Sequence, residues 1–228
     1  MNDTETYRKR CLTQQSELRR QMEDEAGFEL ALRLFLAQHA WLHSARLEDG
    51  ADWSFEDEVF RDLDEADARC IPRGEEHSIA WLIWHIARCE DITLNLLVAG
   101  SPQVLHQHGW LERVNSPLVH TGNAMIPDEV EAFSRAVQLD NLRAYRLAVG
   151  RRTRQIVRQL QPADLRRRVD AARLEQVRAQ GAVLDAAWGI AEYWGRRDAA
   201  GLLLMPATRH PLVHLNQALQ VKRRLRTA

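Results

Sequence analysis

Three histidines in two segments are the residues of this chain best suited to chemistry. His210 and His214 are four residues apart, so on a helix they lie one turn apart on the same face. His85 lies in the middle of the apolar segment 79–99, on the inward face of the helix that this segment predicts. Three inward imidazoles from facing helices can bind one divalent ion and leave a fourth position for water or substrate. An inward histidine can equally be a hydrogen-bonded core residue, and spacing alone leaves both interpretations open.

The segments that must position these histidines predict long helices and no strand. Ala, Leu, Arg, Glu and Gln dominate the sequence, whereas glycine and proline are few and clustered. The polar residues 1–27 should form an arm or outer helix beside a bundle domain of residues 28–228. Within that domain we expect a helix over 28–46 that stops by Gly50, and a short helix after Ser54. We expect further helices over 79–99, with Ser78 as cap, over 127–162 and over 183–194, and a long connection at 101–126.

The start of the last helix determines where its histidines lie. Pro211 would remove an interior hydrogen bond from a helix that had begun at Pro206. We therefore expect Thr208 to cap this helix, which places His210 in the first turn and His214 one turn deeper. The site should then lie toward one end of the bundle.

Longer stretches around the histidines resemble a known family. The stretches SIAWLIWHIARCED and GLLLMPATRHPLVHLNQAL, with TGNAM and LRAYRLAVGRRTR between them, resemble the DinB-like superfamily, specifically a subgroup with WHIAR and TRHxxVHLN-type motifs. The resemblance covers about residue 28 to the C-terminus. It implies an all-α, four-helix bundle with additional short helices, in which one metal is held by residues matching His85, His210 and His214. Pro211 departs from the polar residue expected between the last two.

The resemblance also implies a range of functions. Members of the family include transferases that join a low-molecular-weight thiol to a substrate, related isomerases and stress-induced proteins of unknown activity. The leading interpretation is therefore a metal-dependent thiol transferase or isomerase with a small-molecule substrate. The alternative is a non-catalytic, stress-associated metal-binding or scaffold protein. Imidazole ligands suit zinc, nickel, iron and copper alike, and the sequence assigns no general base.

Further side chains could line the pocket. His39 and His43 form a second pair four residues apart and could replace a ligand. Cys89, one turn after His85, could bind a soft metal or pack as a small hydrophobe. Arg88 could bind an anionic cofactor or a substrate carboxylate, or form a buried ion pair. The other pocket candidates are Trp81, Trp188, Tyr193 and Arg209, and the histidines expected to be exposed in or beside connections are His77, His106, His108 and His120.

The charge balance argues against a nucleic-acid or membrane partner. The 31 basic and 32 acidic residues leave a formal charge of -1. The segment 143–168 contains nine arginines and a single acidic residue, Asp164. Because aromatic residues are not regularly interleaved with the arginines, this segment favours a solvated helix face over a nucleic-acid site.

No apolar run reaches the roughly 18 residues that cross a bilayer, and no signal peptide is recognised. The three scattered cysteines suit a reducing compartment, so we expect a cytoplasmic protein. A homodimer remains open.

Overall fold

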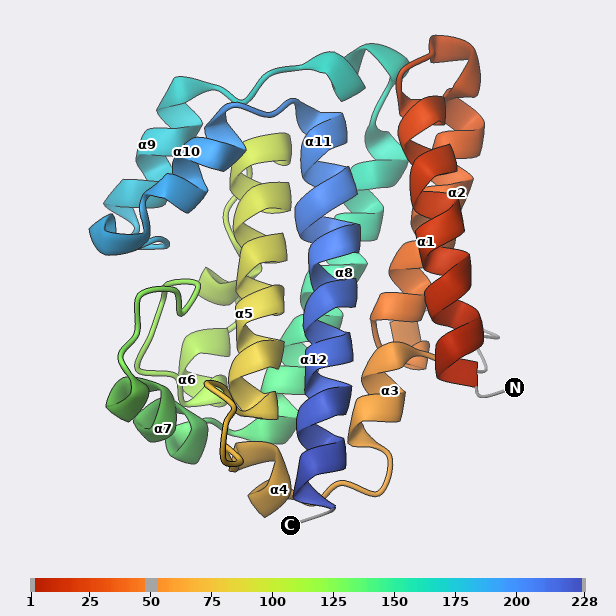
Figure 1. Cartoon of the computed structure of the whole chain (residues 1–228). Coiled ribbons are helices and arrows are strands. Elements are labelled where there is room, and N and C mark those ends of the chain that lie inside the picture. The colour runs from red at the N-terminus through yellow and green to blue at the C-terminus, as the bar shows by residue number, and fades with distance from the viewer. Residues whose placement is uncertain (1–2, 48–52, 227–228) are drawn as a thin grey trace.

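Four long helices form the centre of the molecule in the computed structural model, which describes residues 3–47 and 53–226. They are α2 (Phe28–Leu42), α5 (Ile79–Asp91), α8 (Leu139–Gln159) and α12 (His210–Leu225) (Figure 1). Within the described residues the backbone forms helices and a single isolated bridge but no strand. The prediction of an all-α four-helix bundle with extra short helices is therefore confirmed.

Further helices lie around this bundle. The polar N-terminal residues form α1 (Asp3–Met22), which packs along α2 and α11 (Figure 1). The long connection after α5 carries α6. The other α-helices are α3 (Phe55–Phe60), α4 (Glu65–Arg69), α6 (Trp110–Val114), α7 (Pro127–Ala136), α9 (Ala171–Ala179), α10 (Gly189–Gly195) and α11 (Ala199–Leu204), and 3-10 turns cover Glu25–Gly27, Ala45–Leu47, Val104–His106, Pro162–Arg166 and Asp185–Ala187.

Local capping signals explain several of the helix boundaries. The Ser78 hydroxyl accepts a first-turn amide of α5, as predicted, and the Ser54 hydroxyl caps α3, the helix expected after it, in the same way. A π-helical segment, Ile92–Ala99, continues α5 up to Gly100, which adopts a left-handed conformation. Other boundaries differ from prediction. The helix expected over 127–162 is two helices, and α2 ends at Leu42, before the expected stop at Gly50, which lies outside the described residues.

The last helix does not begin at Thr208, so this prediction was wrong. A π-helical segment, Met205–Arg209, joins α11 directly to α12, and His210 lies in the interior of one continuous helix. The wider π turn accommodates Pro206 and Pro211, whose missing amides would interrupt an α-helix. The Thr208 hydroxyl donates to the Leu204 carbonyl of the preceding turn at 2.9 Å, so it bonds within the helix instead of capping its start.

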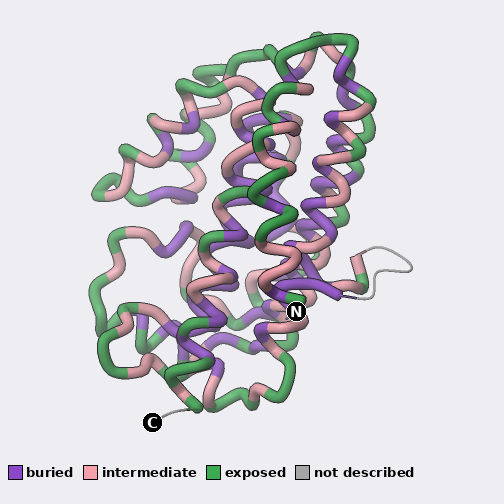
Figure 2. Tube along the Cα trace, turned by 45° about the vertical axis from the view of Figure 1, so that its right-hand side comes forward, coloured by how far each residue is buried: buried purple, intermediate pink, exposed green. Residues whose placement is uncertain are grey.

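The hydrophobic core is divided into two clusters by a polar layer. On α5 the lower cluster ends at Ala87 and the upper one begins at Cys89. Polar residues separate the two clusters at the same level on the other bundle helices: His39 on α2, Thr153 on α8 and His210 on α12. The buried inner faces of these helices are visible in Figure 2. His85 and His210 therefore lie near the middle of the bundle, which corrects the expectation that their site lies toward one end.

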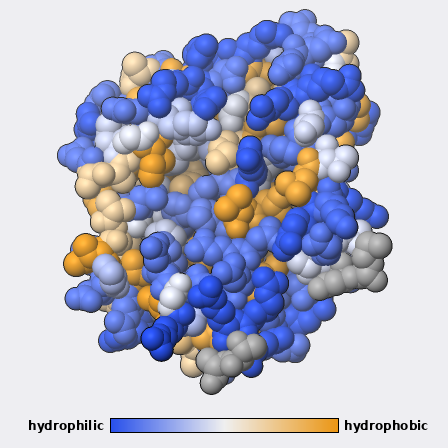
Figure 3. Space-filling view, in the orientation of Figure 1, coloured by the Kyte–Doolittle hydropathy of each residue, from blue (hydrophilic) through white to orange (hydrophobic). Residues whose placement is uncertain are grey.

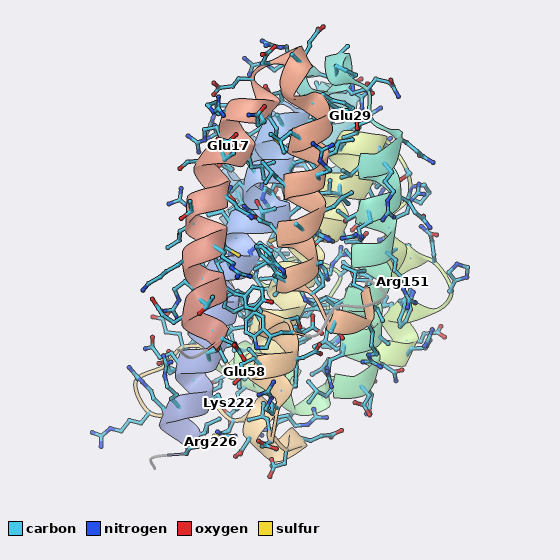
Figure 4. All side chains as sticks on the ribbon, turned by 90° about the vertical axis from the view of Figure 1, so that its right-hand side faces the viewer. Glu17, Glu29, Glu58, Arg151, Lys222 and Arg226 are labelled. Atoms are coloured by element: carbon cyan, nitrogen blue, oxygen red, sulfur yellow. The ribbon has the colours of Figure 1, made fainter. Side chains whose placement is uncertain are left out.

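Side-chain bonds hold the outer helices to α11 and α12. Arg8 Nε of α1 donates to Asn216 Oδ1 at 2.8 Å, and Gln15 Nε2 donates to the Leu204 carbonyl at 2.8 Å. At the lower end, Lys222 Nζ donates to the Glu58 carbonyl at 2.7 Å (Figure 4). Among the described residues no helix is both long and apolar enough to span a membrane.

Candidate metal centre

The three histidines predicted as ligands converge between α5 and α12. The Nε2 atoms of His85 and His210 are 3.0 Å apart. The ring centres of His85 and His214 are separated by 4.9 Å, and those of His210 and His214 by 4.5 Å. Two nitrogens on one tetrahedral zinc ion are about 3.3 Å apart, so the Nε2 atoms of His85 and His210 would need to move by only a few tenths of an ångström. At this site, the ligand atoms that lie within 4.8 Å of one another are those of His85, His210 and Cys89, so His214 would have to move closer to join them. We call His85, His210 and His214 the open cluster.

Hydrogen bonds leave ligand lone pairs directed into this cluster. His85 Nδ1 donates to the Thr121 carbonyl at 2.8 Å, so its Nε2 is unprotonated when the ring is neutral. His214 Nδ1 lies 3.1 Å from Gln217 Oε1, and donation there leaves its Nε2 free in the same way. An outer acceptor that fixes the imidazole tautomer is typical of metal-ligating histidines. His210 Nδ1 is buried and has no such partner among the described residues.

Burial keeps these imidazoles neutral. Desolvation lowers the pKa of His85 to about 3, with the charge of His214 adding to the effect. Burial likewise lowers the pKa of His214, and it lowers the pKa of His210 well below its usual value. Neutral imidazoles are the form that binds a metal. The donor set therefore fits a divalent ion.

The WHIAR motif holds the wall of the pocket through three consecutive carbonyls. Trp84 Nε1 donates to the carbonyl of residue 120 at 3.0 Å, His85 Nδ1 donates to that of residue 121, and Arg88 Nε donates to that of residue 119 at 3.1 Å. Gly122 follows with a positive φ, and a Cβ there would lie 2.9 Å from the Trp81 ring. Helix α5 therefore fixes His85 and the neighbouring loop together.

A cavity of about 590 Å³ opens onto the open cluster. The surface is hollowed on this side, below α10 (Figure 3). Of the predicted residues, Trp81, Cys89 and Tyr193 line it with the three histidines. Its other lining residues are Glu76, His77, Gly122, Asn123, Ala124, Met125, Ile190, Trp194, Met205, Pro206 and Gln217.

Cys89 is a fourth ligand candidate. Its Sγ lies 3.9 Å from the ring nitrogens of His85, and the thiol can reach the same ion as His85 and His210. Burial raises the pKa of Cys89 to about 12, so without a metal it is a neutral thiol.

His39 and His43 belong to a separate, fully buried cluster. His39 Nε2 lies 2.8 Å from Glu90 Oε1, and His43 Nε2 lies 2.9 Å from Glu90 Oε2. The Thr153 hydroxyl also donates to Glu90 Oε1, at 2.7 Å. These donors hold the pKa of Glu90 well below its usual value despite burial, and desolvation lowers the pKa of His43 to about 3. We call His39, His43 and Glu90 the closed cluster; its ligand atoms are also spaced for a metal.

Other predicted pocket residues lie away from the cavity. Arg88 is fully buried against Asp91, Tyr145 and Gln103 and does not line it. Trp188 packs under the Arg178 guanidinium, 3.9 Å from its ring centre.

Arg209 faces two outer hollows. In the arginine-rich block, Arg146 is buried against Glu56 and Arg154 donates to the Leu36 carbonyl.

His77 was missed by sequence reasoning. It lines the cavity and stacks on Trp81 with ring centres 3.7 Å apart, rather than standing free in solvent. Trp81 in turn stacks on His85 at 4.8 Å. The spacing of four residues from 77 to 81 to 85 was the signal available. His120 is also half-buried, and its Nδ1 accepts the Gly122 amide.

Comparison with known proteins agrees with this architecture. The family model described as the DinB superfamily matches residues 51–205. The chain belongs to the DinB superfamily.

The match ends before His210, so the ligand pair lies outside it. A conserved protein of Enterococcus faecalis with a solved crystal structure is similar to this DinB-superfamily chain, with a TM-score of 0.57 and 19% identity, covering 86% of this chain and 97% of that one. At that identity the likeness supports the fold alone. None of the curated proteins matches.

Proposed function

We propose that this DinB-superfamily protein is a divalent-metal-dependent enzyme that acts at the open cluster, as an S-transferase or isomerase using a low-molecular-weight thiol. One observation carries the proposal: the Nε2 atoms of His85 and His210 face each other at 3.0 Å. With His214, they lie at the wall of a cavity large enough for a small substrate.

Different residues would bind the ion, orient the substrate and control the proton on His85. His85, His210 and His214 would hold zinc, nickel or iron, and when bound such an ion supplies a Lewis acid that lowers the pKa of a thiol or water. Trp81 and Tyr193 wall the cavity, so they would orient the substrate and exclude water. The carbonyl of Thr121 keeps the His85 proton on Nδ1, away from the reacting groups.

Metal analysis of protein purified without a His-tag tests the site. We expect about one ion per chain in the wild type and none in His210→Ala/His214→Ala. The variant His106→Asn/His108→Asn removes two exposed imidazoles and should keep its metal. A wild type without stoichiometric metal, or a double variant that keeps it, would overturn the proposed site.

Turnover tests the reaction. The metal-loaded protein should join an electrophile to glutathione, mycothiol or bacillithiol, and the activity should disappear in His210→Ala/His214→Ala. Failure with all three thiols would count against a thiol transferase while leaving the metal site intact.

A non-catalytic scaffold role is the second candidate, and Cys89 is the observation that favours it. If the Cys89 sulfur joined the three imidazoles, the coordination sphere would be closed, as in structural zinc sites. Cobalt substitution distinguishes the two functions, because a thiolate ligand gives an intense sulfur-to-cobalt charge-transfer band. That band, abolished by Cys89→Ser, would favour the scaffold; its absence would favour the enzyme.

Three expectations complete the proposal. A stress-associated role in the cytoplasm follows from the family resemblance and the cysteine usage. A homodimer can be checked by light scattering of the purified chain. Binding of nucleic acid through the arginine-rich segment would appear as steeply salt-dependent DNA affinity, which we do not expect.

A further inference from the structure

A second hollow adjoins the metal cavity and crosses the outer face of α11. It has a volume of about 490 Å³, within the range of roughly 300–1,000 Å³ typical of small-molecule sites. Its floor includes Ala200, Gly201 and Leu204 of α11, and its sides come from α1 and from the end of α10. Figure 1 shows α11 in front, between α10 and α1.

Four arginines surround this hollow. They are Arg19 from α1, Arg166, Arg197 and Arg209. The Arg166 guanidinium donates to the Glu23 carbonyl. Within the described part of the chain, the guanidinium groups of the other three form no hydrogen bond or ion pair.

Two carboxylates at the same hollow offset the charge only partly. Asp198 accepts the Gly201 amide at 2.9 Å as the N-cap of α11, so one of its oxygens is already engaged. Glu23 is the other acid. Four positive charges against two negative ones leave an excess of positive charge. Guanidinium groups are suited to bind carboxylate or phosphate oxygens in pairs.

The hollow adjoins the metal cavity. Tyr193 and Met205 line both. The Arg197 guanidinium lies over the Tyr193 ring, 4.3 Å from its centre, and Arg209 directly precedes His210. A molecule bound at the arginines could therefore extend past Tyr193 and Met205 to the open cluster.

We propose that this hollow, which we call the arginine subsite, binds an anionic arm of the small-molecule ligand whose reactive end reaches the open cluster. The ligand would carry a carboxylate or phosphate several bonds away from the group that reacts. The proposal deepens the proposed function and rests on it for the reactive end alone; anion binding at the arginines does not require a metal.

Calorimetric titration of the full chain with succinate and with inorganic phosphate tests the subsite. We expect Arg19→Gln/Arg197→Gln to raise the dissociation constant about tenfold or more, because two charge-assisted contacts are lost. The control Arg151→Gln/Arg158→Gln removes the same charge from exposed positions of α8, at a distance from the subsite (Arg151 is labelled in Figure 4). It should bind as the wild type does.

The outcomes separate the two proposals. Binding of succinate alone assigns a carboxylate arm, and binding of phosphate alone assigns a phosphate arm. Absence of binding by either anion, or equal weakening in both double variants, overturns the arginine subsite even if the metal is present. If His210→Ala/His214→Ala and the wild type both lack metal but bind succinate, the proposed function fails and the arginine subsite stands.

A cobalt-loaded protein tests whether the subsite and the open cluster share one ligand. The paramagnetic ion should broaden the proton resonances of bound succinate in the wild type. We expect no such broadening in Arg19→Gln/Arg197→Gln. Equal broadening in that variant would mean that succinate binds at the metal alone, which would overturn the shared site.

Discussion

The open and closed clusters use the same side chain in the same spacing and differ in what faces the imidazoles. In the closed cluster His39 of α2 and His43, which directly follows α2, meet the carboxylate of Glu90, which also accepts from Thr153. In the open cluster the histidines face one another, and no carboxylate of the described residues is within hydrogen-bonding distance. A pair of histidines four residues apart is therefore completed by its neighbours. In the closed cluster the imidazoles are bonded to a carboxylate, whereas in the open cluster they face one another, which is the arrangement on which the proposed cation site rests.

Removing the carboxylate should have the largest effect on the closed cluster. Glu90→Ala leaves two buried imidazoles and the Thr153 hydroxyl without their acceptor, so we expect a loss of about 3–5 kcal/mol of unfolding free energy. Urea denaturation measures it, with the exposed Glu175→Ala as control, expected to change by less than about 0.5 kcal/mol. A loss below about 1 kcal/mol would show that Glu90 does not hold the layer together.

Removing the metal should affect the open cluster alone. At a free metal concentration about 1,000 times the dissociation constant, binding stabilises the fold by about 4 kcal/mol. Chelation should then lower the Tm by roughly 8–16 °C. The shift should vanish in His85→Ala and persist in His43→Asn. A persistent shift in His85→Ala would place the stabilising ion elsewhere.

Acid should destabilise the metal-free protein through both clusters. The pKa of His43 and of His85 is about 3 in the folded state, below the value of about 6.5 in the unfolded chain. Between these values the unfolded chain binds more protons, so the stability is intact above pH 6.5 and falls as the pH drops. The slope is about 3 kcal/mol per pH unit for both residues together. The pKa of Glu90 is lowered in the folded state, so its protonation adds a further loss of stability only below about pH 4.5.

Urea denaturation of the metal-free protein at pH 7, 6 and 5 measures this slope. Replacing either His43 or His85 by Asn should reduce the slope by about 1.4 kcal/mol per pH unit. A stability that stays level from pH 6.5 to 5 would mean that these imidazoles are protonated in the folded protein.

The smallest effect on stability should come from adding a side chain to α8 at Gly150, next to the closed cluster. A Cβ at Gly150 would lie 2.7 Å from His43 Nδ1, so Gly150→Ala must displace the ring. We expect a loss of about 1–3 kcal/mol in urea denaturation, with unchanged metal content. A Cβ at Gly189 meets nothing within 4 Å, so Gly189→Ala should leave the stability within about 0.5 kcal/mol.

Local signals predicted much of the fold because they act within a few residues. The Ser78 cap and the apolar run 79–99 identified the whole of α5 with its extension, and the helix expected after Ser54 is α3. The four-residue spacings placed His210 and His214 on one face, and the structure brings both near His85.

Features that depend on contacts distant in sequence could not be predicted in this way. Thr208 has the residue type of a cap, but Pro206 and Pro211 lie in a continuous helix that changes to π geometry between them. The Gln15 side chain, 189 residues away, bonds to the Leu204 carbonyl there. Likewise, nothing near Glu90 in the sequence showed that its carboxylate would meet His39 and His43, about 50 residues earlier.

The hydrogen bond from His85 to the Thr121 carbonyl links ion binding to loop order. A cation can bind His85 Nε2 only when the ring proton is on Nδ1, where it bonds to the Thr121 carbonyl and orders the loop. Conversely, an ordered loop keeps the proton on Nδ1 and leaves Nε2 available. By thermodynamic reciprocity, if the cation favours the ordered loop by some factor, the ordered loop raises the affinity for the cation by the same factor. A substrate that displaced residues 119–121 on entry would therefore loosen the cation, whereas one that packed against them would retain it. If the proposed ion binds at His85, its retention would therefore report how a substrate enters.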